Sequence, residues 1–162
     1  MANKSRKPPK IDDGRRIIAK NRKASHNYHL IESMEVGIVL QGTEVKSLRA
    51  GKCSIVEAFA RITPRNEMQI VRMHIAEYAD GTYNNHETLR TRKLLLKRAE
   101  INRLVRKLKA GNLTLVPTEL YFNSRGIAKL TLCLAQGKKD HDKRHALKKK
   151  QHEREMSRHR IR

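Results

Sequence analysis

The chain has 162 residues, enough for one domain with tails, and its 37 lysines and arginines against 16 acids give a net charge of +21. No apolar run reaches the roughly 18 residues of a membrane helix, no secretory signal is expected from the first ten residues, and two distant cysteines make no disulfide framework. A positive excess of this size repels itself, so it predicts an anionic partner, with nucleic acid the first candidate.

The charge is concentrated at the two ends of the chain. Residues 1–23 carry nine basic and two acidic side chains, residues 137–162 carry eleven and four, and residues 24–136 carry seventeen and ten, so each part has a net charge of +7. Only the central part is apolar enough to bury a core. We expect a disordered basic arm over residues 1–16, a folded domain over 17–136 and a basic tail over 137–162.

Strand patterns open the central part. Apolar and polar residues alternate over 26–31, and β-branched residues fill 34–40, so both segments are predicted strands. Gly37 within the second suggests a bulge or a tight bend of a barrel.

A short helix is predicted over 44–49, where Thr43 can cap the start and Gly51 follows the end. Val45 and Leu48 share one side, which would be buried. The other side would face solvent or a partner; it carries Glu44, Lys46, Ser47 and Arg49.

The second half alternates strands with one longer helix. Segments 55–63 and 67–75 form a probable hairpin, and turn residues fill 78–86. A helical stripe runs through Ile101, Leu104 and Leu108 and stops at Gly111, while residues 94–96 could belong to this helix or be extended chain. Strands are predicted over 113–122 and 127–134, joined by a four-residue turn.

These patterns add up to about six short antiparallel strands with two or three helices. Short strands in this number usually close on themselves to remove exposed edges. The predicted fold is therefore mainly β, a six-stranded antiparallel closed barrel of the oligonucleotide-binding type. After Gly137 the chain has helix formers but few apolar residues, so the tail is expected to be unfolded alone and helical on an anionic surface.

The sequence contains no recognisable motif of an enzyme active site or a metal site. No HExxH, zinc-spaced cysteine pair, phosphate-binding loop or GxSxG occurs, so no metal, cofactor or catalytic residue is predicted. Lys52 could activate Cys53, but an unreactive thiol is the favoured interpretation. Aromatic residues are few, which favours recognition of a folded RNA's shape over stacking on single strands. Tyr28 and Phe59 are expected in the core.

Several longer motifs follow one another in a distinctive order. They are Asn21-Arg22-Lys23-Ala24 with His26 and Tyr28, the stretch from Glu35 to Gly51, Arg90 to Leu96, Leu120 to Phe122, Ala128-Lys129, and Gly137 to Arg144. In these residues, from about Ile18 to Arg144, the chain resembles the bacterial SsrA-binding protein family, also called small protein B.

The resemblance implies a fold, a function and partners. The family has a six-stranded barrel that binds the tRNA-like domain of transfer-messenger RNA (tmRNA), and a tail that becomes a helix in the empty mRNA channel of a stalled ribosome. The implied role is an adaptor for trans-translation in the bacterial cytoplasm. The implied partners are tmRNA, the small-subunit decoding centre with its 16S rRNA, and, through aminoacylated tmRNA, elongation factor Tu. A monomer without membrane contact is expected.

The resemblance also implies site residues. The family's RNA-binding glutamate, leucine and lysine fall on Glu35, Leu95 and Lys129. Its first motif places Asn21, Arg22 and His26 beside the same RNA surface. Beside the resemblance, we expect further RNA contacts from Tyr28 and from the short helix: Thr43, Glu44, Lys46 and Arg49. The ribosome-directed tail root falls on Gly137, Lys138, Lys139, Asp142, Lys143 and Arg144. Thr88 departs from the proline common in the family, which makes the rigidity of the 80–90 loop an open question.

Alternatives stay open for individual residues and for the whole chain. Glu35 could accept hydrogen bonds from bases or could order Lys129 or Arg22, and Leu95 could pack on RNA or in the core. Lys46 and Arg49 could touch phosphates or form a plain solvated face. Other functions are a structural rRNA-binding protein and a basic membrane-surface protein using a helix near 98–109.

Overall fold

A computed structural model describes residues 14–139, together with 148, 151–152 and 155–156. The described strands are β1 (Arg16–Lys20), β2 (Tyr28–Ile38), β3 (Cys53–Ser54), β4 (Phe59–Ile62), β5 (Met68–Val71), β6 (His74–Ile75), β7 (Arg92–Leu95), β8 (Leu113–Phe122) and β9 (Ala128–Gly137). The helices are α1 (Ala24–Asn27), α2 (Gly42–Arg49) and α3 (Arg98–Ala110), with a 3-10 turn over Thr82–Asn84.

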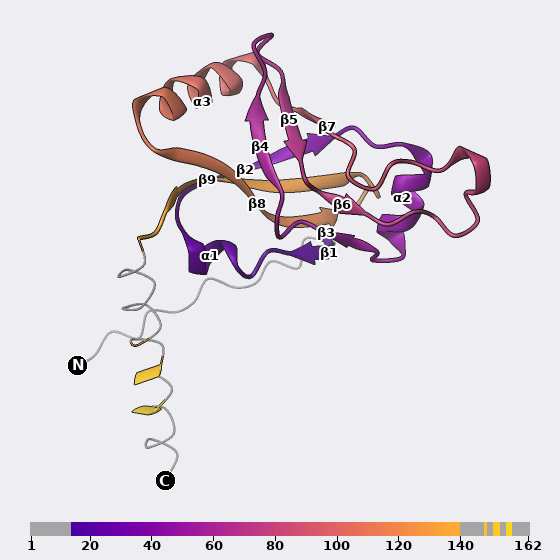
Figure 1. The fold of residues 1–162 in the computed structure, drawn as a ribbon, viewed down its shortest axis with the longest axis horizontal. Coiled ribbons are helices and arrows are strands. Elements are labelled where there is room, and N and C mark those ends of the chain that lie inside the picture. Colours follow the sequence, from indigo (N-terminus) through magenta and orange to yellow (C-terminus); the bar gives the residue numbers. More distant parts are fainter. Residues whose placement is uncertain (1–13, 140–147, 149–150, 153–154, 157–162) are drawn as a thin grey trace.

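Six strands pair in a ring. The order is β8-β4-β5-β7-β2-β9, and β9 pairs with β8 again, while β1 is added outside along β8. All pairings are antiparallel. Figure 1 shows the long β2, β8 and β9 crossing the shorter β4 and β5, with α3 and α2 at opposite sides of the view. The predicted mainly β, antiparallel fold is confirmed.

The ring has the predicted number of strands, but their identities differ. The two strands expected over 26–40 are one strand of 11 residues, β2. The sixth member is β7, in the segment that the sequence left between helix and extended chain. Residues 24–27 instead form α1, which the sequence did not indicate.

The core fills the inside of the ring. Alternate residues of β5, β7, β8 and β9 point inward and are almost fully buried, among them Ile70, Leu94, Leu120 and Leu130. The helix α3 contributes Leu104 to this core and turns its basic side outward. Arg103 and Lys107 on α3 both pair with Glu32 of β2, which ties the helix to the ring.

Gly37 is not at a bulge, because the irregularity in β2 lies between Leu30 and Glu32. Gly37 instead pairs with Leu95 of β7 on one side and with Lys129 of β9 on the other. A side chain at this position would bring its Cβ within 3.2 Å of the Leu95 Cβ, which is tighter than ordinary packing. Glycine therefore lets Leu95 lie close over the C-terminal end of β2.

Helix α2 forms as predicted but begins earlier. Its N-cap is Gln41, which forms a capping box with Glu44, rather than Thr43. Gly51, one residue past the cap at Ala50, has a φ of 72°, the left-handed conformation that glycine adopts most easily. The side with Leu48 is buried as expected, but Glu44 and Ser47 are buried too.

Candidate nucleic-acid interface

The outer side of β2 brings together three residues that the sequence places far apart. Glu35 and Gly37 point outward between buried Val36 and Ile38. Because Leu95 and Lys129 are the two partners of Gly37, both lie on this same outer side. Leu95 is 53% exposed, so it is not a core residue. The predicted trio of Glu35, Leu95 and Lys129 therefore shares one surface.

Glu35 has two protein partners on this surface. Its carboxylate accepts a hydrogen bond from the Tyr121 hydroxyl and lies 3.3 Å from Lys129 Nζ. The hydrogen bond from Tyr121 is the main cause that holds the pKa of Glu35 below its usual range, against a smaller opposing effect of burial, and Lys129 adds to it. Burial, and then the hydrogen bond to Glu35, raise the pKa of Tyr121 to about 12.

The surroundings of this cluster are cationic and apolar. Arg15 lies over the Tyr121 ring, 5.1 Å from its centre. Exposed apolar side chains flank it: Val39, Leu95 and Ile127. We call Arg15, Glu35, Leu95, Tyr121 and Lys129 the β2 cluster. It offers positive charge for phosphates, a carboxylate for base amino groups and an apolar surface for a base or ribose.

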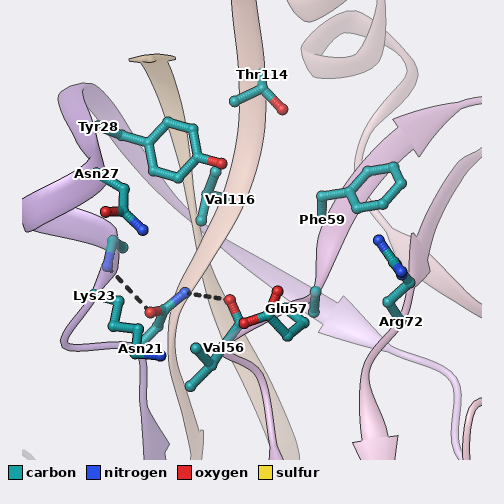
Figure 2. Close-up of a pocket in the computed structure, with 12 residues that line it drawn as sticks. Asn21, Lys23, Asn27, Tyr28, Val56, Glu57, Phe59, Arg72, Thr114 and Val116 are labelled. Atoms are coloured by element: carbon teal, nitrogen blue, oxygen red, sulfur yellow. Dashed lines mark hydrogen bonds between the residues drawn. The ribbon is translucent and has the colours of Figure 1, made fainter. Parts of the chain in front are cut away.

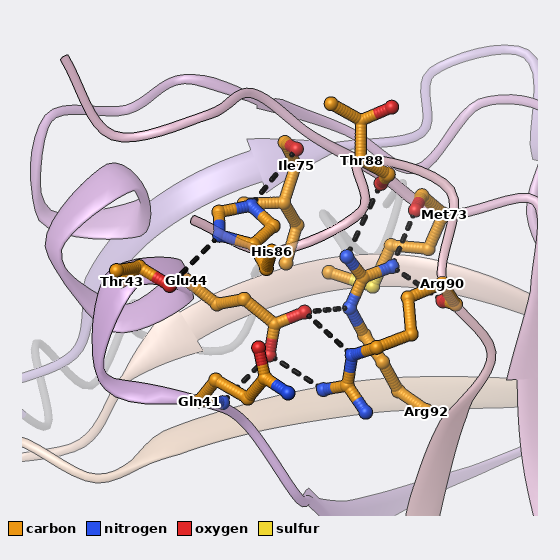
Figure 3. Close-up of polar contacts among 9 residues, drawn as sticks. All are labelled: Gln41, Thr43, Glu44, Met73, Ile75, His86, Thr88, Arg90 and Arg92. Carbon is orange, nitrogen blue, oxygen red and sulfur yellow. Dashed lines mark hydrogen bonds and ion pairs between the residues drawn. The ribbon is translucent and has the colours of Figure 1, made fainter. Parts of the chain in front are cut away.

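Glu44 is not a surface residue, contrary to the prediction that it contacts RNA. Its side chain is fully buried, and its two oxygens lie 2.8 Å from Arg92 Nε and 2.7 Å from Arg90 Nη2 (Figure 3). The backbone N–H of Gln41 donates a further hydrogen bond of 2.7 Å to it. Burial alone would raise the pKa of Glu44, but the hydrogen bonds of Arg90 and Gln41 and the charge of Arg92 hold it below its usual range.

Arg92 completes this buried group. It is fully buried, and its Nη atoms donate to the carbonyl oxygens of Met73, Arg90 and Thr88 at 2.6, 2.9 and 3.2 Å. Burial lowers the pKa of Arg92, and Glu44 opposes that effect. Since an arginine stays charged even so, the group joins α2, β7 and the 86–90 segment by charge. We call Glu44, Arg90 and Arg92 the α2 cluster.

Thr43 and Thr88 are held by the same part of the fold. The Thr43 hydroxyl lies 3.0 Å from Nδ1 of buried His86, whose Nε2 lies 3.2 Å from the Ile75 carbonyl (Figure 3). The carbonyl of Thr88, which stands where the family commonly has proline, accepts bonds from Ile75 N–H and Arg92. This segment is therefore fixed by hydrogen bonds without a proline.

The remaining two candidates on α2 are exposed. Lys46 lies over the Tyr78 ring, 5.0 Å from its centre, and the Arg49 carbonyl accepts a hydrogen bond of 3.1 Å from Arg16. The charged ends of both side chains reach the surface on the same helix. They can contact phosphates, and their neighbour Glu44 cannot.

In the motif that begins at Asn21, Asn21 itself is buried whereas Arg22 and His26 are exposed. The Asn21 amide donates toward the carbonyls of Ile55, Val56 and Pro117, and its oxygen accepts from Ala24 N–H. Arg22 and His26 are exposed on either side of this anchor. Asn21 therefore holds α1 against β8 and presents its neighbours, rather than touching a partner itself.

The prediction that Tyr28 and Phe59 belong to the core is wrong for Phe59 and half right for Tyr28. Phe59 is 38% exposed. Tyr28 packs on a small satellite cluster of Ala24, Val116 and Ala135, but its ring remains half-buried. Both aromatic residues line one pocket on the outside of β4 and β8 (Figure 2).

The root of the tail leaves the ring beside α1. Gly137 and Lys139 are exposed, and Lys138 is fixed by its N–H to the Asn27 carbonyl at 2.9 Å and by its Nζ to the Ser25 carbonyl at 2.8 Å. The predicted ribosome contacts Asp142, Lys143 and Arg144 lie outside the described residues, as do residues 1–13 of the arm expected over 1–16. The last residue of that expected arm, Arg16, is instead the first residue of β1. Lys148, 151–152 and 155–156 are helical and exposed.

Other chemistry is not supported by the described part of the chain. Burial raises the pKa of the Cys53 thiol to about 11, so it is not an activated nucleophile. Among residues 14–139 and the short described pieces of the tail, no three His, Cys, Asp or Glu side chains could hold a metal ion. In the same residues no helix is long and apolar enough to cross a membrane.

The sequence did not indicate Arg15, Tyr121, Arg90 and Arg92 as parts of either cluster. Tyr121 and Arg92 stand in motifs of the resemblance, but nothing in their spacing says that one meets Glu35 and the other Glu44. The first contact joins strands β2 and β8 and the second joins helix α2 to strand β7, between residues that lie 86 and 48 positions apart in the chain.

The comparisons with known proteins agree on one family. The family described as "SmpB protein" matches residues 18–162. A protein named SsrA-binding protein from Parafrankia sp. (strain EAN1pec) is 50% identical over 147 residues, covering 91% of this chain and 92% of the relative. Another of that name, from Corynebacterium glutamicum (strain R), is 49% identical over 154 residues, with 95% and 93% covered.

A solved structure is also similar. It is described as "tmRNA-SmpB: a journey to the center of the bacterial ribosome", has a TM-score of 0.64 and is 48% identical. The match covers 76% of this chain and 85% of that one. The ring of strands described above is thus that protein's fold.

Proposed function

The chain belongs to the SmpB protein family, and on that premise we propose that it is an RNA-binding adaptor that brings tmRNA to stalled ribosomes for trans-translation. The observation that carries the proposal is the β2 cluster, where Glu35, Leu95 and Lys129 meet across three strands on one outer surface. The net charge of +21 suits two polyanionic partners, tmRNA and the ribosome.

Within the β2 cluster each residue has a distinct task. Lys129 is 28% exposed at its side chain and pairs with Glu35, so it is held in place and can still reach a phosphate. Glu35 keeps lone pairs beyond those used by Tyr121 and Lys129, and these can accept from base amino groups. The two interpretations of Glu35 are thus compatible. Leu95 supplies an apolar contact for a base or ribose.

Further contacts extend this surface. Arg22 and His26 beside α1, with Lys46 and Arg49 on α2, are exposed cations or hydrogen-bond donors. Asn21 and Glu44 support them from inside, Asn21 by fixing α1 and Glu44 by fixing α2 to β7. We assign these two residues to positioning and the exposed ones to contact.

The tail is assigned to the ribosome. It carries eleven of the basic residues and begins at Gly137, where Lys138 binds α1 and directs the chain away from the ring. We propose that Lys139, Asp142, Lys143 and Arg144 enter the mRNA channel next to the decoding centre and the tail becomes helical there. The chain acts in the cytoplasm by binding, with no catalytic step of its own.

Filter binding of tmRNA to the full chain over a range of salt concentrations tests the proposal. The logarithm of the affinity should fall linearly with the logarithm of the salt concentration, by roughly 0.7–0.9 per phosphate contact. A salt-independent affinity would contradict it. Loading onto stalled ribosomes, measured by sedimentation, should depend on tmRNA; a structural rRNA-binding protein would load equally without it.

Truncation after Gln136 separates the ring from the tail. We expect tmRNA affinity to change little and peptide tagging on stalled ribosomes to be lost, because the β2 cluster remains and the tail does not. A truncated chain that no longer binds tmRNA would show that the tail carries the affinity.

A further inference from the structure

A second polar site lies on the ring, away from the β2 cluster. It is a pocket of about 310 Å³ over β4 and the beginning of β8, beside α1. The β2 cluster lies instead on β7, β2, β9 and the end of β8. The volume of the pocket is within the range of small-ligand sites. Figure 2 shows Tyr28 and Phe59 on opposite sides of it, with the Tyr28 hydroxyl directed toward the gap between them and Arg72 on the Phe59 side.

Three charged side chains that line this pocket, Lys23, Glu57 and Arg72, are exposed to solvent. In the part of the chain that the structure describes, the side chains of Lys23, Glu57 and Arg72 form no hydrogen bond or ion pair, although all three line the same pocket. By contrast, the acids within the ring strands, Glu32, Glu35 and Glu119, are each paired with a cation. An unpaired carboxylate and an unpaired guanidinium at one pocket can both recognise a ligand.

The backbone of Arg72 is strained where it enters this pocket. Its φ is 58°, in the left-handed region that is unfavourable for a residue with a side chain. It stands between β5 and β6, a position where glycine would fit without strain. In this conformation the guanidinium lies at the rim beside Phe59.

We propose that this pocket binds a single unpaired guanine base, supplied by an RNA that the tail root approaches. The rings of Tyr28 and Phe59 provide apolar and stacking contacts, Glu57 accepts from the base edge, and Arg72 donates to it. Lys23 and exposed Arg22 lie at the α1 side, where they can contact the adjoining phosphate. Asn27 lines the pocket and also binds Lys138, so the tail leaves the ring at this site.

Guanine fits these groups better than the other bases. It has two adjacent donors, N1–H and the N2 amino group, which match the two oxygens of one carboxylate. Its O6 and N7 atoms accept from arginine. Cytosine and adenine offer a single amino group and uracil a single N–H, so each leaves one Glu57 oxygen without a donor. Such paired contacts discriminate by roughly tenfold to a hundredfold.

The inference rests on the proposed RNA-binding function. The experiment below distinguishes failure of the guanine pocket from failure of RNA binding by the chain. The full chain is titrated with GMP, AMP, CMP and UMP and with the pentanucleotides UUGUU and UUAUU, followed by NMR of the Asn27 side-chain amide and the Arg72 Nε–H. We expect both signals to shift with UUGUU, with at least about tenfold weaker binding of UUAUU. GMP binding as tightly as UUGUU would identify a free nucleotide as the source and overturn the RNA part of the proposal.

Two variants and a matched control complete the test. Arg72→Gly removes the guanidinium and relieves the strained backbone, so Tm should stay or rise while the preference for guanine falls at least about tenfold. Glu57→Gln should also remove the preference for guanine, because only one acceptor oxygen then faces the two donors of the base. Arg65→Gln removes the same charge from the β4–β5 turn and should leave the preference intact. Equal binding of all four bases, or a preference that survives Glu57→Gln, would overturn the proposal even if tmRNA still binds the β2 cluster.

Discussion

Two glutamates of this chain lie among cations, and their surroundings give them opposite roles. Glu35 in the β2 cluster has one cation and one hydroxyl as partners and a side chain that is 46% exposed. Glu44 in the α2 cluster has two arginines and a backbone N–H and is fully buried. The exposed carboxylate can exchange partners with RNA, whereas the buried one would leave two arginines unpaired if it moved.

The comparison teaches that a motif residue near an RNA surface need not touch RNA. In the sequence Glu44 follows Thr43 and precedes the exposed Lys46, and one family motif contains all three residues. The helix nevertheless turns Glu44 inward onto β7, so its effect on RNA binding would be indirect. Substitutions in the two clusters should therefore separate into losses of stability and losses of affinity.

Breaking the α2 cluster should have the largest effect. Glu44→Gln leaves Arg92 buried without an anion, and we expect a loss of about 3–5 kcal/mol in the free energy of unfolding. Urea denaturation followed by circular dichroism measures it. Glu67→Gln removes an exposed partner of Lys93 and is the matched control, with little change expected. An equally small change for Glu44→Gln would show that the two arginines need no buried anion.

The same cluster predicts how stability depends on pH. The pKa of Glu44 in the folded chain lies below its ordinary value of 4.5, so the unfolded chain takes up the proton first as pH falls. The contribution is complete above about pH 5 and is lost as pH falls through the folded-state pKa. Urea midpoints between pH 6 and 3 should therefore fall more steeply for the native chain than for Glu44→Gln. Parallel curves would contradict this role of Glu44.

Reversing a charge in the β2 cluster should affect RNA rather than the fold. Lys129→Glu places two carboxylates side by side on a partly exposed surface, and we expect tmRNA affinity to fall about thirtyfold, or ~2 kcal/mol, with Tm nearly unchanged. Filter binding and thermal denaturation measure the two quantities. Lys20→Glu, on β1, changes the charge equally and serves as the control. A collapsed fold would instead show that Lys129 is structural.

A backbone change at the centre of the β2 cluster should have a smaller effect on both quantities. Gly37→Ala places a methyl group within 3.2 Å of the Leu95 Cβ, so Leu95 must shift outward. We expect a loss of about 1 kcal/mol in stability and a severalfold loss of tmRNA affinity. Gly42→Ala, where an added Cβ meets nothing within 4 Å, is the control. If Gly37→Ala binds tmRNA like the native chain, the position of Leu95 does not matter.

The smallest effect is expected at the exposed glutamate. Glu35→Gln keeps the shape and the hydrogen bond from Tyr121 but removes the charge that Lys129 faces. The free energy of unfolding should change by less than about 1 kcal/mol, because exposed ion pairs contribute little. Its urea denaturation curve, compared with that of Glu44→Gln, measures directly how differently the two glutamates contribute to stability. A loss as large as that of Glu44→Gln would remove the distinction between the two clusters.

The sequence alone determined the class of this protein and much of its layout. The sequence predicted two strands over 113–122 and 127–134 on either side of a four-residue turn, and β8 and β9 lie there. Apolar spacing predicted the helices around Leu48 and Leu104. The basic excess and the ordered motifs identified an RNA partner, since charge and local motifs are written in neighbouring residues.

Tertiary structure decided which of the candidate residues can meet a partner. Exposure depends on how strands pair and how a helix is rotated on the ring, and neither is encoded by local spacing. This is why Glu44 and Asn21 proved buried, Phe59 proved exposed and Tyr121 joined Glu35. Glu44 meets Arg92 of β7, Asn21 meets Pro117 of β8 and Glu35 meets Tyr121 of β8, and only the folded ring brings these distant residues together.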